Sequence, residues 1–393
     1  MSKKRTIDAF FGAAIPKPPK KPRDVNTVSP ETSLGNAHLD GLKTASNAKE
    51  PEVALSQDAK SVPTEAFTKQ NVPGSIKTEE AIPRNSDDFS MHPAYPFPIP
   101  HLPPALAAEL PSWPASLGRV INDQPDLDLL YFEPYVARGL GGSGGSARAL
   151  FEFLRAELPF YRVEYDINRG GTSTHIRTPR WTTVFGLDDT SRFGGSGNEK
   201  ILDAKNGCDV SADKFYTRYK PRSIPKCLDD LRRSAQEATG CEFNFCLVNY
   251  YASGADSISF HSDDERFLGP LPAIASFSLG ARRDFLLKHK PTPPPMGGEH
   301  TEAMKNATSK PLKLPLASGD MILMRGPTQA NWLHSIPKRT GKNAADGGRI
   351  NITFRRALIK AGTDNYYNYN VGTGPVYKWD RVNREMQLWK KDL

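Results

Sequence analysis

Apolar residues follow two different spacings along this chain. Between residues 146 and 158 they recur every three or four positions, which predicts an amphipathic helix capped by Ser146. The same spacing predicts a second helix over residues 225–238, ended by Gly240. After Gly240 the apolar residues come instead in short runs separated by Gly, Pro, Asp and Ser, which predicts strands joined by turns.

The predicted strands are short, and most of them follow the second helix. They cover residues 127–132, 242–250, 257–261, 273–279, 283–289, 313–316, 321–324 and 349–359. Many short strands after two helices are typical of a sandwich or jelly roll with helices packed outside it. The sequence therefore predicts an α+β fold with a jelly-roll core.

The composition changes near residue 90. Up to Asp88 the only aromatic residues are Phe10, Phe11 and Phe67, in a stretch rich in Pro, Lys, Ser, Thr and Glu. Such a segment buries too little apolar surface to offset its chain entropy. We therefore expect residues 1–90 to form a disordered tail.

The rest of the chain divides into three parts by composition. Residues 91–124 are rich in proline with interleaved aromatics, and we expect them to wrap over the folded domain without regular structure or to act as a linker. Residues 125–360 are long enough to bury one sizeable core. The aromatic segment 361–393 is expected to cap that core.

The charge balance favours a polyanionic partner such as nucleic acid. The chain carries 52 Lys and Arg against 44 Asp and Glu, a net charge of +8. It has no run of about 18 apolar residues and no apolar signal-peptide core, so we expect neither a membrane span nor secretion. Its cysteines are too few and too irregularly spaced for a disulfide framework or a zinc ribbon, so we expect thiols: Cys208, Cys227, Cys241 and Cys246.

Two basic runs lie in the predicted tail, over residues 3–5 and 16–23. The second is interrupted by prolines, so it stays extended and solvated, as suits reading by an import receptor. A charge run that only solubilises the tail has the same composition. We expect a nuclear protein.

A small apolar cluster lies between the two basic runs. Ile7, Phe10 and Phe11 fall on one side of a short helical turn and would form a plug for a partner's pocket. They resemble the PCNA-interacting peptide, although Lys4 stands where that motif has glutamine. The resemblance implies a PCNA-like sliding clamp as partner, and a chance apolar cluster is the alternative.

A candidate metal site begins at the end of the predicted strand 257–261. Residues two apart on an extended chain project from the same face, so His261 and Asp263 can reach one ion. A third ligand from a distant strand would complete the two-histidine, one-carboxylate set that holds non-haem iron(II). Alone, this motif is weak, since about half a match is expected by chance in a chain with eight histidines.

The segment Arg349–Arg355 strengthens that interpretation. Strand alternation places Arg349, Asn351, Thr353 and Arg355 on one face, opposite an apolar face. Two arginines directed into a fold interior are costly without an anionic partner, and a dicarboxylate would supply one. An edge strand with solvated arginines is the alternative.

Several segments together carry a family resemblance. They are Asn249-Tyr250-Tyr251, His261-Ser262-Asp263-Asp264-Glu265, residues 275–280, Arg283-Asp284-Phe285, the N-W-L-H-S run around His334, and Arg349–Arg355. In this order they resemble the AlkB family of 2-oxoglutarate- and iron(II)-dependent dioxygenases, and most closely its eukaryotic nuclear DNA-repair members. The resemblance covers roughly residues 127–357. It implies a double-stranded β-helix jelly roll with flanking helices and a nucleotide-recognition lid over about residues 160–195.

The resemblance also implies a catalytic centre. His261, Asp263 and His334 would bind iron(II), and O2 would bind there with the co-substrate 2-oxoglutarate. His289 and His300 are alternative ligands, but only His334 lies in the matching sequence context.

The co-substrate site follows from the same comparison. Arg349 would pair with the distal carboxylate of 2-oxoglutarate, helped by Tyr251 and Asn351. Arg355 and Asn249 would lie near the end of 2-oxoglutarate that binds the iron.

The substrate contacts implied by the resemblance lie in the lid and near the metal. Glu265 would read the exocyclic amine of a flipped base, and Arg180 belongs to the lid motif. Trp181 or Phe185 could sandwich the base, although ordinary core packing is the alternative for both. The hairpin around residues 166–172 could fill the vacated stack, but Ile167 is its only apolar candidate.

A basic loop follows His334. Lys338, Arg339 and Lys342 would bind phosphates of the opposite DNA strand.

The resemblance also implies an activity and an oligomeric state. The activity is oxidative demethylation of N-alkylated bases such as 1-methyladenine and 3-methylcytosine in DNA, with release of formaldehyde, and the protein would act as a monomer. An RNA or protein demethylase of the same class, or a non-catalytic DNA-binding scaffold tethered to PCNA, are the alternatives.

Overall fold

A computed structural model describes residues 86–139, 145–195, 197–291, 311–340 and 347–391 of the chain. The tail motif at Ile7, Phe10 and Phe11 and both basic runs lie outside these residues. His300 and Lys342 also lie outside them. The fold consists of mostly antiparallel strands with few helices.

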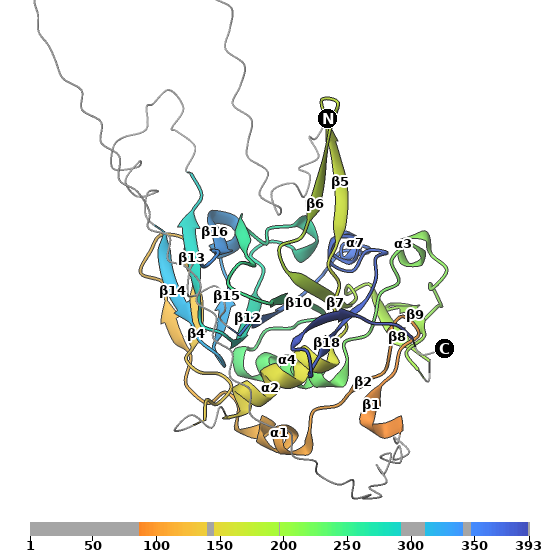
Figure 1. Ribbon diagram of the computed structural model, residues 1–393, viewed down its shortest axis with the longest axis horizontal. Coiled ribbons are helices and arrows are strands. Elements are labelled where there is room, and N and C mark those ends of the chain that lie inside the picture. The colour runs from red at the N-terminus through yellow and green to blue at the C-terminus, as the bar shows by residue number, and fades with distance from the viewer. Residues whose placement is uncertain (1–85, 140–144, 196, 292–310, 341–346, 392–393) are drawn as a thin grey trace, which may run out of the picture. The chain divides into compact units, whose positions relative to one another are not determined.

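Two antiparallel sheets contain the strands that form the centre of the fold (Figure 1). The larger sheet has the order β3 (Arg119–Ile121), β4 (Leu129–Phe132), β15 (Met321–Met324), β12 (Ile274–Gly280), β17 (Arg349–Arg355), β10 (Phe245–Tyr251) and β7 (Trp181–Gly186). The smaller sheet has the order β11 (Ile258–His261), β16 (Trp332–Ile336), β13 (Arg283–His289) and β14 (Leu312–Leu316). Between β10 and β17 the chain passes repeatedly from one sheet to the other, which brings distant parts of the sequence together.

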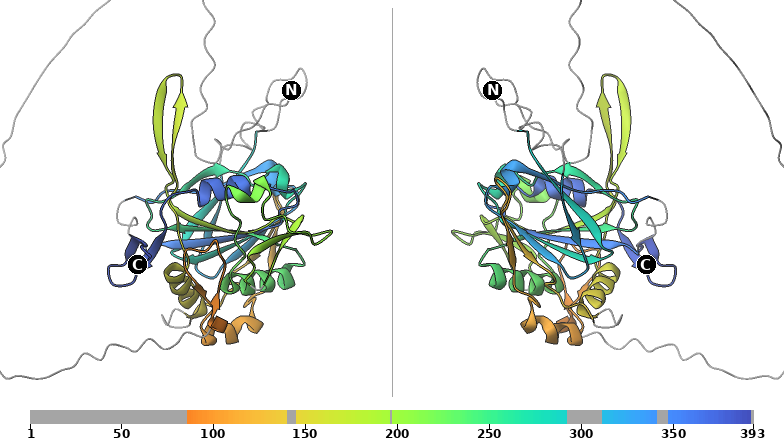
Figure 2. Two further views of the ribbon diagram at one scale, coloured as in Figure 1. Left: turned by 90° about the vertical axis from the view of Figure 1, so that its right-hand side faces the viewer. Right: turned by 90° about the vertical axis from the view of Figure 1, so that its left-hand side faces the viewer.

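Apolar side chains fill both faces of the larger sheet. On one face Leu247 and Ile322 pack in a buried cluster with Phe285 and Leu287 of the smaller sheet. On the other face, α2 (Gly145–Glu157) and α4 (Lys226–Thr239) bury their predicted apolar sides. Leu154 is fully buried, a burial worth about 1.5–3 kcal/mol. Figure 2 shows α2 and α4 on one side of the sheets and α7 (Asp364–Asn370) on the other.

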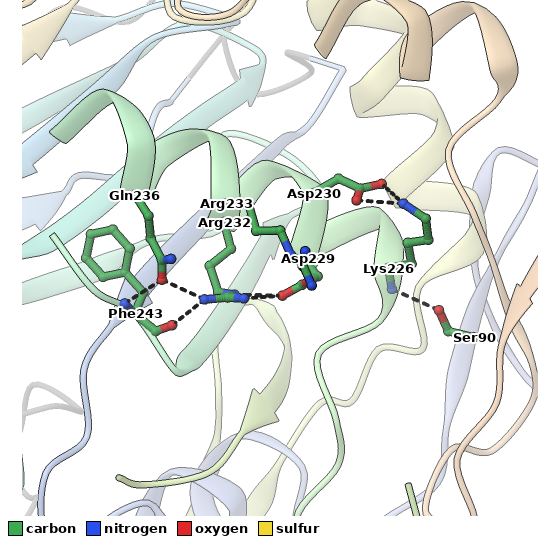
Figure 3. A network of polar contacts seen from close by, with 8 residues as sticks. All are labelled: Ser90, Lys226, Asp229, Asp230, Arg232, Arg233, Gln236 and Phe243. Carbon is green, nitrogen blue, oxygen red and sulfur yellow. Dashed lines mark hydrogen bonds and ion pairs between the residues drawn. The ribbon is translucent and has the colours of Figure 1, made fainter. Parts of the chain in front are cut away.

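Helix α4 is held at its last turn and at its start by polar contacts (Figure 3). Arg232 Nη1 donates to Gln236 Oε1 at 2.6 Å and to the Phe243 carbonyl at 2.8 Å, which ties the helix to the chain that enters β10. The Lys226 amide donates to Ser90 Oγ at 2.8 Å. Gly240 ends the helix with a left-handed φ of 67°, as the sequence predicts.

The expectation that residues 91–124 lack regular structure is wrong. They wrap the domain and contain short elements: β2 (Ile99–Pro100), which pairs with β1 (Phe89–Ser90), then α1 (Pro104–Glu109) and β3. Ile99, Leu106 and Trp113 belong to the buried apolar cluster that also contains residues of α2 and α4. Burial of these side chains stabilises the segment despite its prolines.

A two-stranded hairpin projects from the domain (Figure 1). It consists of β5 (Glu164–Arg169) and β6 (Thr172–Arg177), joined by Gly170 and Gly171. Both glycines have positive φ, 55° and 83°, as a two-residue hairpin turn requires. One face of the hairpin carries Tyr165 opposite Ile176, and the Tyr165 ring lies 5.6 Å from the Tyr369 ring of α7.

The remaining elements are short. They are β8 (Ser191–Gly194), β9 (Lys200–Asp203), α3 (Lys214–Thr217), α6 (Thr328–Asn331), β18 (Tyr377–Asp380) and β19 (Glu385–Leu388). None of the helices in the described part of the chain is long and apolar enough to cross a membrane. The four cysteines are free thiols, as expected.

The predicted helices and strands are all present, with some differences at their ends, but several further elements were not predicted, among them two strands of the central sheets. Strand β17 ends at Arg355 rather than at residue 359, because Arg356 turns outward to Asp189 and Glu242. Strands β7 and β16 were not predicted. Their polar residues interrupt the apolar alternation, since both strands carry buried polar side chains such as Thr182 and His334.

Candidate active site

The two predicted histidine ligands meet through the pairing of two strands. His261 is the last residue of β11, and His334 lies within β16. These strands pair antiparallel with His261 directly opposite His334, and the two ring centroids are 4.2 Å apart. Sheet register therefore brings together residues 73 positions apart in the sequence.

Asp263 completes a buried group with the two histidines. One ligand atom from each of His261, Asp263 and His334 lies within 4.8 Å of the others, and all three residues are buried. Two imidazoles and one carboxylate are the set that binds iron(II) on one face and leaves other positions open. His289 lies outside this group, because its Nδ1 faces the Lys290 carbonyl at 2.7 Å and its ring packs on Trp332.

The protonation states of the histidines suit a metal ion. Nδ1 of His261 lies 2.8 Å from the Ser259 carbonyl, so Nδ1 carries the proton and the lone pair lies on Nε2. Burial lowers the pKa of His261, and burial together with His261 lowers the pKa of His334 to about 3. Both rings are therefore neutral near pH 7 and can act as ligands.

Asp263 is held by two neighbours and keeps one oxygen for a ligand. Arg355 Nη2 donates to Asp263 Oδ2 at 3.0 Å, and the Asp263 amide donates to Gln329 Oε1 at 2.9 Å. Although burial acts in the opposite direction, Arg355 holds the pKa of Asp263 below its usual range. Among the described residues Asp263 Oδ1 is buried and has no hydrogen-bond partner. This donor set fits iron(II).

The alternation predicted for β17 places its polar side chains toward the smaller sheet. Arg349 is buried, donates from Nη2 to Ser278 Oγ at 2.8 Å, and lies 5.5 Å from the centre of the Tyr251 ring. A buried guanidinium between a hydroxyl and an aromatic ring suits a carboxylate. Asn351 donates to Ser276 Oγ and to the Phe277 carbonyl, so its amide nitrogen is bound to β12.

Arg180 and Asn249 form one buried pair. Arg180 Nε donates to Asn249 Oδ1 at 2.9 Å, and burial lowers the pKa of Arg180. Arg180 therefore lies in the wall of the site, beside the strand that carries Tyr251, rather than on the outer surface.

Trp181 and Phe185 do not line the site, which corrects the expectation that either ring stacks on a base. In β7, Thr182 lies opposite Asn249, whereas Trp181 lies opposite Tyr250. Neighbouring strand residues point to opposite faces, so Trp181 and Phe185 share the face of Tyr250. Both rings are buried in the core beneath α2 and α4.

Glu265 lies beside the metal group and is held by a residue that the sequence analysis missed. The Tyr366 hydroxyl of α7 donates to Glu265 Oε1 at 2.9 Å. Burial and the Asp263 carboxylate raise the pKa of Glu265 to about 7. The signal available for Tyr366 was weak: a tyrosine-rich stretch in the predicted cap, with nothing to indicate which ring turns inward.

The predicted basic loop borders a surface pocket of about 640 Å³. Lys338 and Arg339 line this pocket together with Arg282 and Lys313. Asp284 also lines it and forms an ion pair with Lys313 at 2.7 Å. Arg339 Nη2 donates to the Arg282 carbonyl, so Lys338 is the more freely placed of the two predicted cations.

Comparison with known proteins agrees with this arrangement. The 2OG-Fe(II) oxygenase superfamily model matches residues 147–355. The DNA oxidative demethylase ALKBH2 of Arabidopsis thaliana is 37% identical over 161 residues, which cover 36% of this chain and 48% of the relative. ALKBH2 of Homo sapiens is 39% identical over 139 residues, 35% of this chain and 49% of the relative.

A third relative belongs to the same group. The alpha-ketoglutarate-dependent dioxygenase alkB homolog 3 of Homo sapiens is 41% identical over 128 residues, 33% of this chain and 41% of the relative. In each case the chain spans less than half of the relative's length. The superfamily match nevertheless covers more than half of the chain. The chain therefore belongs to the 2OG-Fe(II) oxygenase superfamily, within which it is similar to AlkB homologues.

Proposed function

We propose that this protein is a DNA dealkylation-repair dioxygenase that removes methyl groups from base nitrogens such as N1 of adenine and N3 of cytosine. The observation that carries the proposal is the buried group His261, Asp263 and His334, together with a buried Arg349 on β17, the strand whose Arg355 contacts Asp263. The DNA substrate is supported by the name of the ALKBH2 relatives, DNA oxidative demethylase.

Different side chains of the site would bind the metal ion, bind the co-substrate and orient the metal ligand. His261, Asp263 and His334 would hold iron(II), and Arg349 would bind the far carboxylate of 2-oxoglutarate through charge-assisted hydrogen bonds. When bound, iron(II) with 2-oxoglutarate and O2 supplies the oxidising power that hydroxylates an N-methyl carbon, after which formaldehyde leaves. Arg355 keeps the Asp263 carboxylate oriented and ionised.

Glu265 provides the recognition of the base. Burial, followed by the charge of Asp263, raises the pKa of Glu265, so the Glu265 carboxyl group lies within electrostatic reach of the metal group. A base that reacts there must leave its stack, because the N-methyl group lies on the base-pairing edge. Glu265 would then accept a hydrogen bond from the exocyclic amine.

The proposal also includes a jelly-roll architecture, a clamp partner, action in the nucleus and a monomeric state. The division of β10–β17 between two sheets supports a double-stranded β-helix jelly roll. The apolar cluster at Ile7, Phe10 and Phe11 supports recruitment by a PCNA-like clamp, and the basic runs support action in the nucleus. We infer that the chain acts as a monomer.

Release of formaldehyde from oligonucleotides carrying one methylated base is the decisive experiment. DNA and RNA strands of the same sequence should be compared, with succinate measured in parallel. We expect turnover on DNA that requires both iron(II) and 2-oxoglutarate. Turnover on RNA alone would assign the RNA demethylase instead, and a chain that binds DNA without oxidising 2-oxoglutarate would be the scaffold.

A further inference from the structure

The C-terminal helix α7 places one tyrosine against the base-reading carboxylate. Helix α7 begins at Asp364, beyond the segment 147–355 that matches the superfamily model. Tyr366 is 6% exposed, and its hydroxyl donates to Glu265 Oε1 at 2.9 Å. A residue outside the matched segment thus contacts the side chain that is expected to read the base.

Packing fixes the ring of Tyr366 from several directions. The ring makes edge contacts with Phe245 at 5.4 Å and Phe267 at 5.6 Å, measured between ring centroids. The Arg355 guanidinium, which holds Asp263, lies 4.9 Å from the centre of the same ring. The hydroxyl position is therefore set by contacts that do not depend on Glu265, and the hydroxyl can orient the carboxylate.

The two carboxylate oxygens of Glu265 differ in their hydrogen bonding. Oε1 accepts from Tyr366, whereas Oε2 is buried and has no hydrogen-bond partner within the described ranges. A buried carboxylate oxygen without a donor is unfavourable, and a ligand N–H placed there would relieve the cost. Because Tyr366 occupies Oε1, Oε2 is the oxygen left to face a ligand.

We propose that Tyr366 is a positioning residue that fixes the Glu265 carboxylate so that Oε2 meets the exocyclic amino group of the base. This inference rests on the proposed function and deepens it. 3-Methylcytosine has an exocyclic amino donor, whereas 3-methylthymine has none. The inference is that α7, a helix outside the matched segment, provides part of the selectivity for 3-methylcytosine. Without the tyrosine hydroxyl, the carboxylate can rotate and offers the amine a less well-defined acceptor.

The test compares two tyrosines that are neighbours in α7. Tyr366→Phe removes only the hydroxyl bound to Glu265, and the ring contacts remain. Tyr367→Phe is the matched control, because its buried hydroxyl donates to the Gly186 carbonyl and does not contact Glu265. Fluorescence anisotropy of the metal-free full chain gives the Kd for single-stranded oligonucleotides that carry one 3-methylcytosine or one 3-methylthymine.

We expect Tyr366→Phe to weaken binding of the 3-methylcytosine strand about 3- to 10-fold and to leave the 3-methylthymine strand nearly unchanged. The ratio of kcat/KM for the two lesions should fall by a similar factor in the loaded enzyme. Tyr367→Phe should leave both ratios unchanged. Equal losses on the two lesions, or no loss on either, would overturn the inference.

A double variant separates positioning of Glu265 from any other role of Tyr366. In a Glu265→Ala background, Tyr366→Phe should change the lesion ratio no further, and an additional change would overturn the inference. Failure of the proposed function is recognised separately. A parent enzyme that oxidises neither lesion contradicts that function, whereas the lesion ratio in binding by the metal-free chain still decides the role of Tyr366.

Discussion

Arg355 and Asp263 form a buried ion pair, with Arg355 Nη2 3.0 Å from Asp263 Oδ2, across 92 positions of sequence. Arg355 ends the central strand β17, whereas Asp263 follows the smaller-sheet strand β11. Both residues are almost fully buried, so removing one partner would leave an uncompensated charge. This contact orients the carboxylate whose other oxygen, Oδ1, is left for a metal ion.

Loss of one metal ligand should strongly weaken metal binding and stop turnover. We expect His334→Ala to weaken Mn²⁺ binding, measured by calorimetry, beyond the 10- to 100-fold that loss of a supporting residue typically costs, and to stop turnover. His289→Ala is the control, since His289 lies outside the group and packs on Trp332. Mn²⁺ binding by His334→Ala at the parent affinity would contradict the site.

Arg349→Ala should raise the apparent KM for 2-oxoglutarate, because charge-assisted contacts to its far carboxylate are lost. The expected rise is at least about 10-fold, from 1.5–3 kcal/mol for such bonds. Arg356→Ala is the control, because Arg356 follows the same strand but pairs on the surface with Asp189 and Glu242. Initial rates of succinate formation across 2-oxoglutarate concentrations measure both variants, and an unchanged KM in Arg349→Ala would place the co-substrate elsewhere.

Glu265→Ala should narrow the preference for lesions with an exocyclic amine. At neutral pH 1-methyladenine and 3-methylcytosine are cationic, so the parent enzyme should favour them about 10- to 100-fold over 3-methylthymine. In the variant, the rate of demethylation of the cationic lesions should fall, whereas the rate for 3-methylthymine should change little. Initial rates of formaldehyde release from otherwise identical oligonucleotides provide the measurement, and equal rates for 3-methylcytosine and 3-methylthymine in the parent enzyme would refute the role of Glu265.

Lys338→Ala should weaken DNA binding uniformly, with or without a lesion, if the basic pocket contacts phosphates. The slope of log Kd against log salt should fall by about 1. Lys390→Ala, an exposed lysine near the C-terminus, is the matched control. Anisotropy titrations at several salt concentrations measure the slope, and identical slopes in both variants would remove this pocket from the DNA interface.

The tail motif is expected to act independently of catalysis. A peptide of residues 1–23 should bind a PCNA-like clamp, and replacing Phe10 and Phe11 together by alanine should abolish binding, because both rings of the predicted plug are lost. The same double change in the full chain should leave turnover on short oligonucleotides unaltered. Calorimetry on parent and variant peptides tests this, and equal affinities would reject the motif.

The sequence by itself determined the features that depend on local spacing. The three- to four-residue apolar period of α2 and α4 and the alternation of β17 depend on neighbouring positions, so all three elements form where predicted, except that β17 ends earlier. The same holds for His261 and Asp263, which lie two apart on an extended chain. His334 was assigned through its sequence context, since local spacing cannot indicate a partner on another strand.

Only the tertiary structure decided which distant residues meet and which face of a strand is the site. The register of β11 with β16 sets His261 opposite His334, and the packing of α7 brings Tyr366 to Glu265. Trp181 and Phe185 lie in the core because α2 and α4 cover their face of the larger sheet. Local alternation separates the two faces of a strand, but it is burial by the rest of the chain that makes one of them the site.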